Sequence, residues 1–96
     1  MCNINCMRFE WDAAKDNANK GKHGIDFETA KGLWLDENHI EIQAPNPIEN
    51  RHIIIGKIQG KLWTAVYTIR DDAVRIISVR RSRKKEVELY EKENAG

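Results

Sequence analysis

Residues 67–81 read Tyr-Thr-Ile-Arg-Asp-Asp-Ala-Val-Arg-Ile-Ile-Ser-Val-Arg-Arg, and this stretch decides the predicted fold. Apolar, β-branched runs flank Asp71-Asp72, a pair that suits a two-residue hairpin turn. We therefore expect strands at residues 62–70 and 73–80. A strand at residues 52–58, joined to the first of these through Gln59-Gly60, extends the hairpin to an antiparallel meander.

If both turns contain two residues, Ile53 lies opposite Val66, and Val66 lies opposite Ile77. Because opposed residues share a face of a sheet, this register divides the side chains into two sets. The predicted core face carries Ile54, Ile58, Trp63, Ala65, Tyr67, Ile69, Val74 and Ile76. The other face carries Arg51, Ile53, Ile55, Thr64, Val66, Thr68, Arg70, Arg75, Ile77 and Val79. A slip of one residue would exchange the two faces.

The remaining elements follow from helical spacing and from caps. The two predicted helices before the meander are residues 13–22, between an Asp12 N-cap and Gly24, and residues 26–35, opened by Asp26. A last helix is expected at residues 82–93, with Ser82 as its N-cap. Residues 7–11 suit an edge strand, residues 38–42 suit a short strand, and Ala-Pro-Asn-Pro at 44–47 predicts a loop.

The predicted order is β-α-α-β-β-β-α. This is an α+β fold, with two helices on one face of an antiparallel sheet and a C-terminal helix. Residues 1–7 are expected to form a tail, and residues 8–93 a single domain.

Composition excludes several classes of protein. The 96 residues are 32% charged and carry a net charge of +1, which is unlike a disordered chain or a non-specific polyanion binder. The cysteines, Cys2 and Cys6, have no histidine or cysteine set at ligand spacing, so we expect no metal, no other cofactor and a reducing cytoplasmic setting. No window approaches the roughly 20 apolar residues of a membrane span.

Arginines at the meander are the first candidates for function. In the predicted register Arg51, Thr68 and Arg75 adjoin, so arginines converge at one end of the second face, whereas Arg80 falls at the end of the core face. Guanidinium groups in such an array suit phosphate, and Thr68 would add a hydroxyl donor. The alternative is a solvated face in which Arg pairs with Asp71 and Asp72 across the strands.

Three further side chains could take part in chemistry. His23 lies beside Gly24 at a helix end, where it is either part of a cap or a general base or acid. Glu86 and Tyr90 are four residues apart on one helix face, where the carboxylate could orient an arginine and the phenol could stack on a base or move a proton. The alternative is an ordinary helix surface. His39 and His52 have weaker claims, and Trp11, Trp34 and Trp63 are expected to anchor the core.

An ordered set of residues resembles the BrnT family of bacterial type II toxin–antitoxin toxins. The first half of the set is Phe9-Glu10-Trp11-Asp12, Lys15, Asn19, Lys22-His23-Gly24-Ile25, Phe27 and Ala30. The second half is Arg51, Gly56, Thr68-x-Arg70, Arg75-Ile76-Ile77-Ser78, Arg80-Arg81, Glu86 and Tyr90. The resemblance implies a RelE-like fold and a ribonuclease that blocks translation. It also implies neutralisation by a BrnA-type antitoxin, a ribbon–helix–helix protein, whose complex with the toxin binds their own promoter mainly through the antitoxin.

Chemistry and resemblance together predict a site. The expected catalytic residues are His23, Arg51, Arg70, Arg80, Glu86 and Tyr90, and the expected substrate-binding residues are Lys22, Thr68, Arg75 and Arg81. The expected reaction is metal-independent RNA cleavage, with His23 or Glu86 as base and Tyr90 or a lysine as acid. There are two rival hypotheses. The first is a non-catalytic module that binds an acidic partner or nucleic acid, and the second is an interaction protein covered by a partner.

Overall fold

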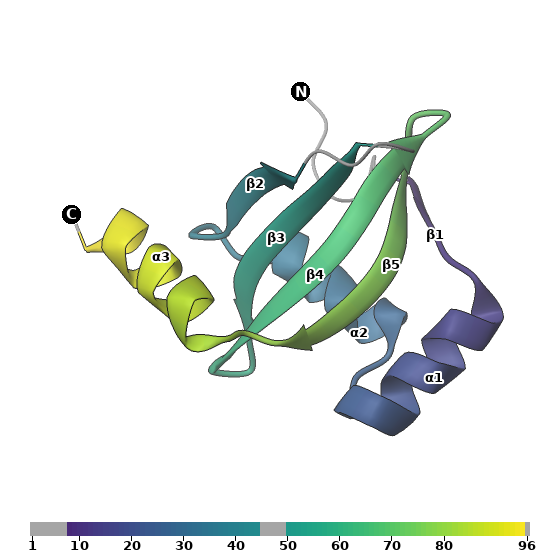
Figure 1. Ribbon diagram of the computed structural model, residues 1–96, viewed down its shortest axis with the longest axis horizontal. Coiled ribbons are helices and arrows are strands. Elements are labelled where there is room, and N and C mark those ends of the chain that lie inside the picture. The colour runs from purple at the N-terminus through teal and green to yellow at the C-terminus, as the bar shows by residue number, and fades with distance from the viewer. Residues whose placement is uncertain (1–7, 45–49, 96) are drawn as a thin grey trace.

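A computed structural model describes residues 8–44 and 50–95 (Figure 1). Within these ranges a five-stranded sheet has the order β1-β5-β4-β3-β2. The strands are β1 (Arg8–Glu10), β2 (Ile40–Ala44), β3 (Arg51–Ile58), β4 (Lys61–Arg70) and β5 (Ala73–Arg81). The helices are α1 (Ala13–His23), α2 (Phe27–Ala30), which continues as the 3-10 helix Lys31–Leu35, and α3 (Lys84–Asn94). The predicted tail at residues 1–7 and most of the predicted loop at 44–47 lie outside the described residues.

The α+β class is confirmed, but two features of the predicted sheet are wrong. β1 pairs with β5 in parallel, so the sheet is mixed, although β1 does lie at its edge as expected. The predicted order also left out β2, which pairs antiparallel with β3. Both differences concern edge strands, where a few residues of pairing are decided by tertiary contacts and leave little signal in the sequence.

Capping residues set the helix boundaries largely as predicted. The Asp12 carboxylate accepts hydrogen bonds from the amides of Ala14 and Lys15, at 2.8 and 3.1 Å. Gly24 ends α1 in the left-handed conformation at φ 76°, which favours a residue without a Cβ. α3 differs from the prediction: Arg83 rather than Ser82 is its N-cap, because the Ser82 hydroxyl pairs with Thr64 at 2.8 Å.

The core lies between the sheet and the first two helices. Phe27, Ala30 and Leu33 project from the α2 segment onto strand residues of one sheet face, all but one of which were predicted to lie in the core. The strand residues in this cluster are Ile54, Ala65, Tyr67, Val74, Ile76 and Val79. Trp11, Trp34 and Trp63 pack against it as expected, and His52 stacks on Tyr67 with a ring separation of 5.2 Å. Ile69, predicted to be in the core, is 51% exposed near the hairpin tip.

β5 contains one residue more than the predicted register allows. Ile53 does pair with Val66, and Thr68 with Arg75, but Val66 pairs with Ser78 and not with Ile77. The shift between Val66 and Tyr67 is a β-bulge that leaves Ile77 without a partner on β4. Beyond the bulge the predicted faces of the β5 residues are therefore reversed. Val79 enters the core, whereas Arg80 lies opposite Thr64 on the other face of the sheet.

A buried asparagine joins α1 to β5. The Asn19 side-chain oxygen accepts a hydrogen bond from the Val79 amide at 3.0 Å, and its side-chain nitrogen donates to the Ile25 carbonyl at 2.9 Å. Asn19 is 6% exposed, so both backbone groups depend on this one side chain.

Replacing Asn19 with alanine should lower the free energy of unfolding by about 2–3 kcal/mol, because it leaves buried backbone groups unpaired. Urea denaturation followed by circular dichroism measures the change. Asn17→Ala, at an exposed position of the same helix, is the matched control and should change stability by less than about 0.5 kcal/mol. Equal effects of the two variants would show that the Asn19 bridge contributes nothing.

Candidate functional site

The junction between β5 and α3 is organised by a bidentate ion pair. The two terminal nitrogens of Arg80 contact the two Glu86 oxygens at 2.7 and 2.8 Å. The same carboxylate accepts hydrogen bonds from the Arg83 amide at 2.7 Å and from the Thr64 hydroxyl at 3.1 Å. The Arg80 guanidinium lowers the pKa of Glu86 to about 2, although burial acts in the opposite direction. Glu86 is therefore an orienting carboxylate and a weak proton acceptor.

Tyr90 is an anchor for α3 in this structure. Its side chain is buried, and its hydroxyl donates to the Asp36 carboxylate at 2.8 Å. Asp36 also accepts the amides of Asn38 and Lys57, at 3.0 and 2.8 Å. Burial, followed by the bond to Asp36, raises the pKa of Tyr90. A buried phenol with a raised pKa that already donates its proton to a carboxylate is poorly placed to protonate a leaving group.

The remaining predicted arginines lie on the face of the sheet that carries Arg80. Arg75 forms an ion pair with Glu10 at 2.8 Å, and the buried Thr68 hydroxyl donates to the Asn50 carbonyl at 2.9 Å. Arg70 is exposed at the end of β4, and Arg51 is partly buried at the start of β3. Within the described part of the chain, neither Asp71 nor Asp72 pairs with these arginines, and it is Glu10 that offsets part of their charge.

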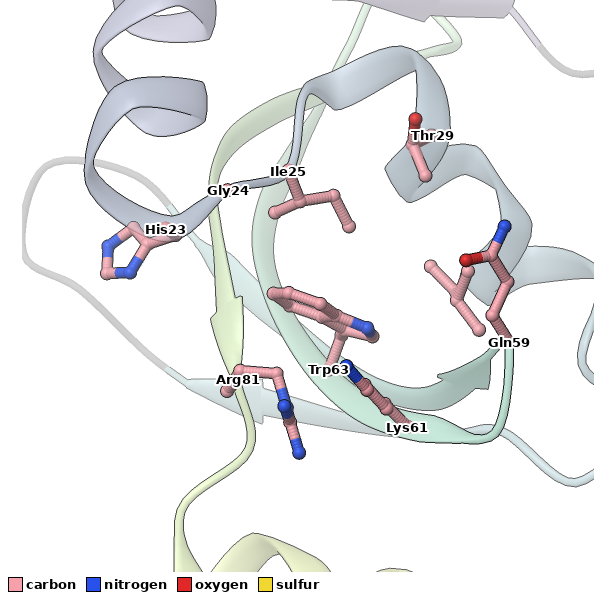
Figure 2. A pocket seen from close by; sticks show the side chains of 9 residues that line it. His23, Gly24, Ile25, Thr29, Gln59, Lys61, Trp63 and Arg81 are labelled. Carbon is pink, nitrogen blue, oxygen red and sulfur yellow. The ribbon is translucent and has the colours of Figure 1, made fainter.

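A pocket of about 440 Å³ lies where the C-terminal end of α1 approaches the β3–β4 turn. Figure 2 shows the indole of Trp63 in the middle of this view, with Ile25 on one side and the Lys61 and Arg81 side chains on the other. The lining residues are His23, Gly24, Ile25, Thr29, Ile58, Gln59, Lys61, Trp63 and Arg81. The pocket combines an imidazole, a lysine, an arginine and an aromatic ring.

Arg80 beside α3 is paired with a carboxylate, whereas the cationic side chains that line this pocket are not paired with one in the described residues. The Arg81 guanidinium lies over the Trp63 ring, 5.4 Å from its centroid. Across residues 8–44 and 50–95, no carboxylate forms an ion pair with His23, Lys61 or Arg81. An anion that enters the pocket would therefore meet the charges of Lys61 and Arg81, which no carboxylate in the described residues neutralises.

The predicted site residues thus fall into three groups. His23 and Arg81 share the pocket, and Lys22 lies beside it in a shallower hollow with Ser78. Arg80, Glu86 and Tyr90 hold α3 in place. The third group, toward the opposite end of the second sheet face, comprises Arg51, Thr68, Arg70 and Arg75. The sequence reasoning missed Lys61, and it treated Trp63 as core alone, because the unrecognised bulge hid the pairing of Trp63 with Arg81.

No three His, Cys, Asp or Glu side chains among the described residues are grouped so that they could hold a metal ion. None of the helices at residues 8–44 and 50–95 has the length and apolar character that crossing a bilayer requires.

The chain matches a known protein family. Residues 11–86 match the family described as the ribonuclease toxin BrnT of type II toxin–antitoxin systems. No curated protein matches the chain. The family match covers α1, the meander and the start of α3, and so includes both the pocket and the Arg80–Glu86 pair.

The depressed pKa of Glu86 predicts how the ion pair depends on pH. A carboxyl whose folded pKa lies below its ordinary value near 4.5 stabilises the fold above that value, and the contribution is lost as pH falls toward about 2. Glu86→Gln should lower the free energy of unfolding by about 1–3 kcal/mol at neutral pH, and the difference from wild type should shrink in this window. Urea titrations at several pH values measure it, with exposed Glu88→Gln as control; a gap that does not vary with pH would contradict the assignment.

Proposed function

The chain belongs to the BrnT family of ribonuclease toxins of type II toxin–antitoxin systems, and we propose that it cleaves RNA without a metal ion at the pocket shared by His23 and Arg81. Membership of such a family implies an RNA substrate and an antitoxin partner. The observation that carries the proposal is that one pocket gathers an imidazole, a lysine and an arginine, none of them paired with a carboxylate in the described structure.

The proposed reaction is an attack of RNA on its own backbone. His23 accepts the proton of a ribose 2′-hydroxyl as the 2′ oxygen forms a bond to the adjacent phosphorus. The bond from phosphorus to the 5′ oxygen then breaks, and that oxygen takes a proton from solvent or a neighbouring lysine. The products are a 2′,3′-cyclic phosphate and a 5′-hydroxyl. Arg81 lines the same pocket and would stabilise the negative charge of the phosphorane.

The pair formed by Arg80 and Glu86 has a supporting role in this proposal. Both terminal nitrogens of Arg80 are occupied by Glu86, so this arginine is less available to phosphate than Arg81. Arg80 and Arg81 are neighbours on β5, and the ion pair fixes the junction from which Arg81 projects. Tyr90 acts in the same way by holding α3 to Asp36. We therefore assign Arg80, Glu86 and Tyr90 as positioning residues.

The partner we propose is a BrnA-type antitoxin with a ribbon–helix–helix fold. In this proposal the toxin has a RelE-like fold, blocks translation in the cytoplasm and binds its own promoter only as part of the antitoxin complex. The support is the family match over residues 11–86, together with the ordered set of residues from Phe9 to Tyr90 that resembles the family. Growth arrest on induction, relieved by a neighbouring ribbon–helix–helix gene, is the expected result; growth without arrest would count against toxicity.

The catalytic proposal predicts cleavage of single-stranded RNA by the purified protein in EDTA. His23→Gln should reduce the rate about 10²–10⁴-fold, the range typical of a general base. Arg81→Ala should reduce it about 10²–10³-fold, as when one donor to a developing oxyanion is lost. End-group analysis of the products should find cyclic phosphates and 5′-hydroxyls. His39→Gln, a histidine outside the pocket, is the matched control and should retain activity.

Several outcomes would overturn the assignment. Loss of all cleavage in EDTA would show that a metal ion is needed. If Arg51→Ala or Arg70→Ala abolished cleavage while His23→Gln did not, the reaction centre would lie on the second face of the sheet. RNA binding with no cleavage by the wild-type protein would favour the non-catalytic module.

A further inference from the structure

We infer that Lys61 and Trp63 form a nucleotide subsite in the pocket, in which an RNA base stacks beside the indole and its phosphate is bound by Lys61. The inference rests on the proposed function, because it places the nucleotide next to His23 and Arg81. It assigns binding roles to two residues that neither the family resemblance nor the candidate list included. The ligand class is a nucleotide of single-stranded RNA.

The size and lining of the pocket suit such a ligand. Its volume of about 440 Å³ lies within the roughly 300–1,000 Å³ range of small-molecule sites. The lining includes the apolar side chains of Ile25 and Ile58, and Gln59 adds an amide that can donate and accept hydrogen bonds. A base needs a flat apolar contact together with a few polar groups at its edges, and this lining supplies both.

Trp63 and Arg81 together make the stacking surface. They are paired residues on β4 and β5, and the guanidinium carbon of Arg81 lies 5.4 Å from the centroid of the Trp63 ring. Bases in single-stranded RNA stack on aromatic rings and on arginine planes, with little dependence on sequence. Because Trp63 also packs against the hydrophobic core, this platform is held in place before any ligand arrives.

Lys61 supplies a charge at the first residue of β4, immediately after the β3–β4 turn. Its position is fixed by a pairing with Ile58 across the hairpin, and the turn residues Gln59 and Gly60 both have positive φ values, 51° and 80°. No anionic side chain in the described ranges pairs with Lys61. An unpaired lysine beside an aromatic platform is the arrangement by which single-stranded nucleic acid is held through both backbone and base.

The test separates binding from cleavage by using RNA that cannot react. A fluorescein-labelled oligonucleotide of mixed sequence with 2′-O-methyl at every position lacks the attacking hydroxyl, so anisotropy reports affinity alone. Trp63→Leu should weaken binding about tenfold through lost stacking, whereas Trp63→Phe, which keeps an aromatic ring, should stay within about threefold of wild type. Lys61→Ala should weaken binding and reduce the slope of log affinity against log salt by about 1.

Controls distinguish a pocket effect from a general one. Lys92→Ala, at an exposed position near the end of α3, should change affinity less than twofold. Thermal melting checks that each Trp63 variant is folded. If Trp63→Leu is unfolded, Lys61→Ala still tests the subsite, because Lys61 is exposed and its replacement should leave the fold intact. If Lys61→Ala binds like wild type with an unchanged salt slope, or a folded Trp63→Leu binds like Trp63→Phe, the subsite does not exist.

A parallel assay on unmodified RNA keeps the two proposals apart. If the wild type cleaves RNA, and binding and cleavage are unchanged in the Lys61 and Trp63 variants, the subsite proposal is wrong and the ribonuclease proposal is retained. Weakened binding in those variants, with no cleavage by wild type, supports the subsite and overturns the catalytic proposal. If inorganic phosphate competes for the pocket as strongly as adenosine monophosphate does, a base does not contribute to binding, because phosphate has none. That result would overturn the proposal that a base stacks beside Trp63.

Discussion

One extra residue in β5 decides which side chains at the end of that strand face α3 and which face the pocket. Because Ile77 has no partner on β4, the strand changes its alternation halfway along, and this decides which face each of the two arginines at its end reaches. Arg80 reaches Glu86 and the start of α3, while Arg81 reaches Trp63 and the pocket. Without the bulge these two destinations would be exchanged. The bulge therefore decides which of the two arginines forms the ion pair with Glu86 and which lines the pocket.

Two carboxylates connect α3 to the sheet, and both are fully engaged. Glu86 accepts the Arg83 amide at the start of the helix and pairs with Arg80, whereas Asp36 accepts hydrogen bonds from the Tyr90 hydroxyl and the Lys57 amide. α3 has few apolar residues, so these polar contacts carry much of its attachment. Close packing at Gly56 supports the same region, since a Cβ there would lie 3.1 Å from Leu33. Glu86, an acidic residue that the sequence analysis predicted to be catalytic, here helps to assemble the fold.

The local parts of the fold could be predicted, because their causes are local. Asp12, Gly24 and Asp26 act through neighbouring amides or backbone conformation, and Asp71-Asp72 makes a two-residue turn with both φ values positive. The parallel pairing of β1 could not be predicted, because it depends on a partner more than sixty residues away. The bulge was equally hidden, since no glycine or turn residue marks Ile77. For that reason only part of the pocket could be predicted. His23 and Arg81 were predicted from their residue types, but Trp63 and Lys61 become neighbours of Arg81 only in the observed register.

The Asn19 side chain has an effect that reaches beyond stability. β1 covers only the first part of β5, so the later amides of β5 lie along a strand edge that faces away from β4. Asn19 takes the Val79 amide on that edge, and α1 lies alongside it. Exposed strand edges are where chains join sheet to sheet and aggregate. The Asn19 side chain, together with the helix that carries it, therefore occupies part of an edge that a foreign strand could otherwise pair with.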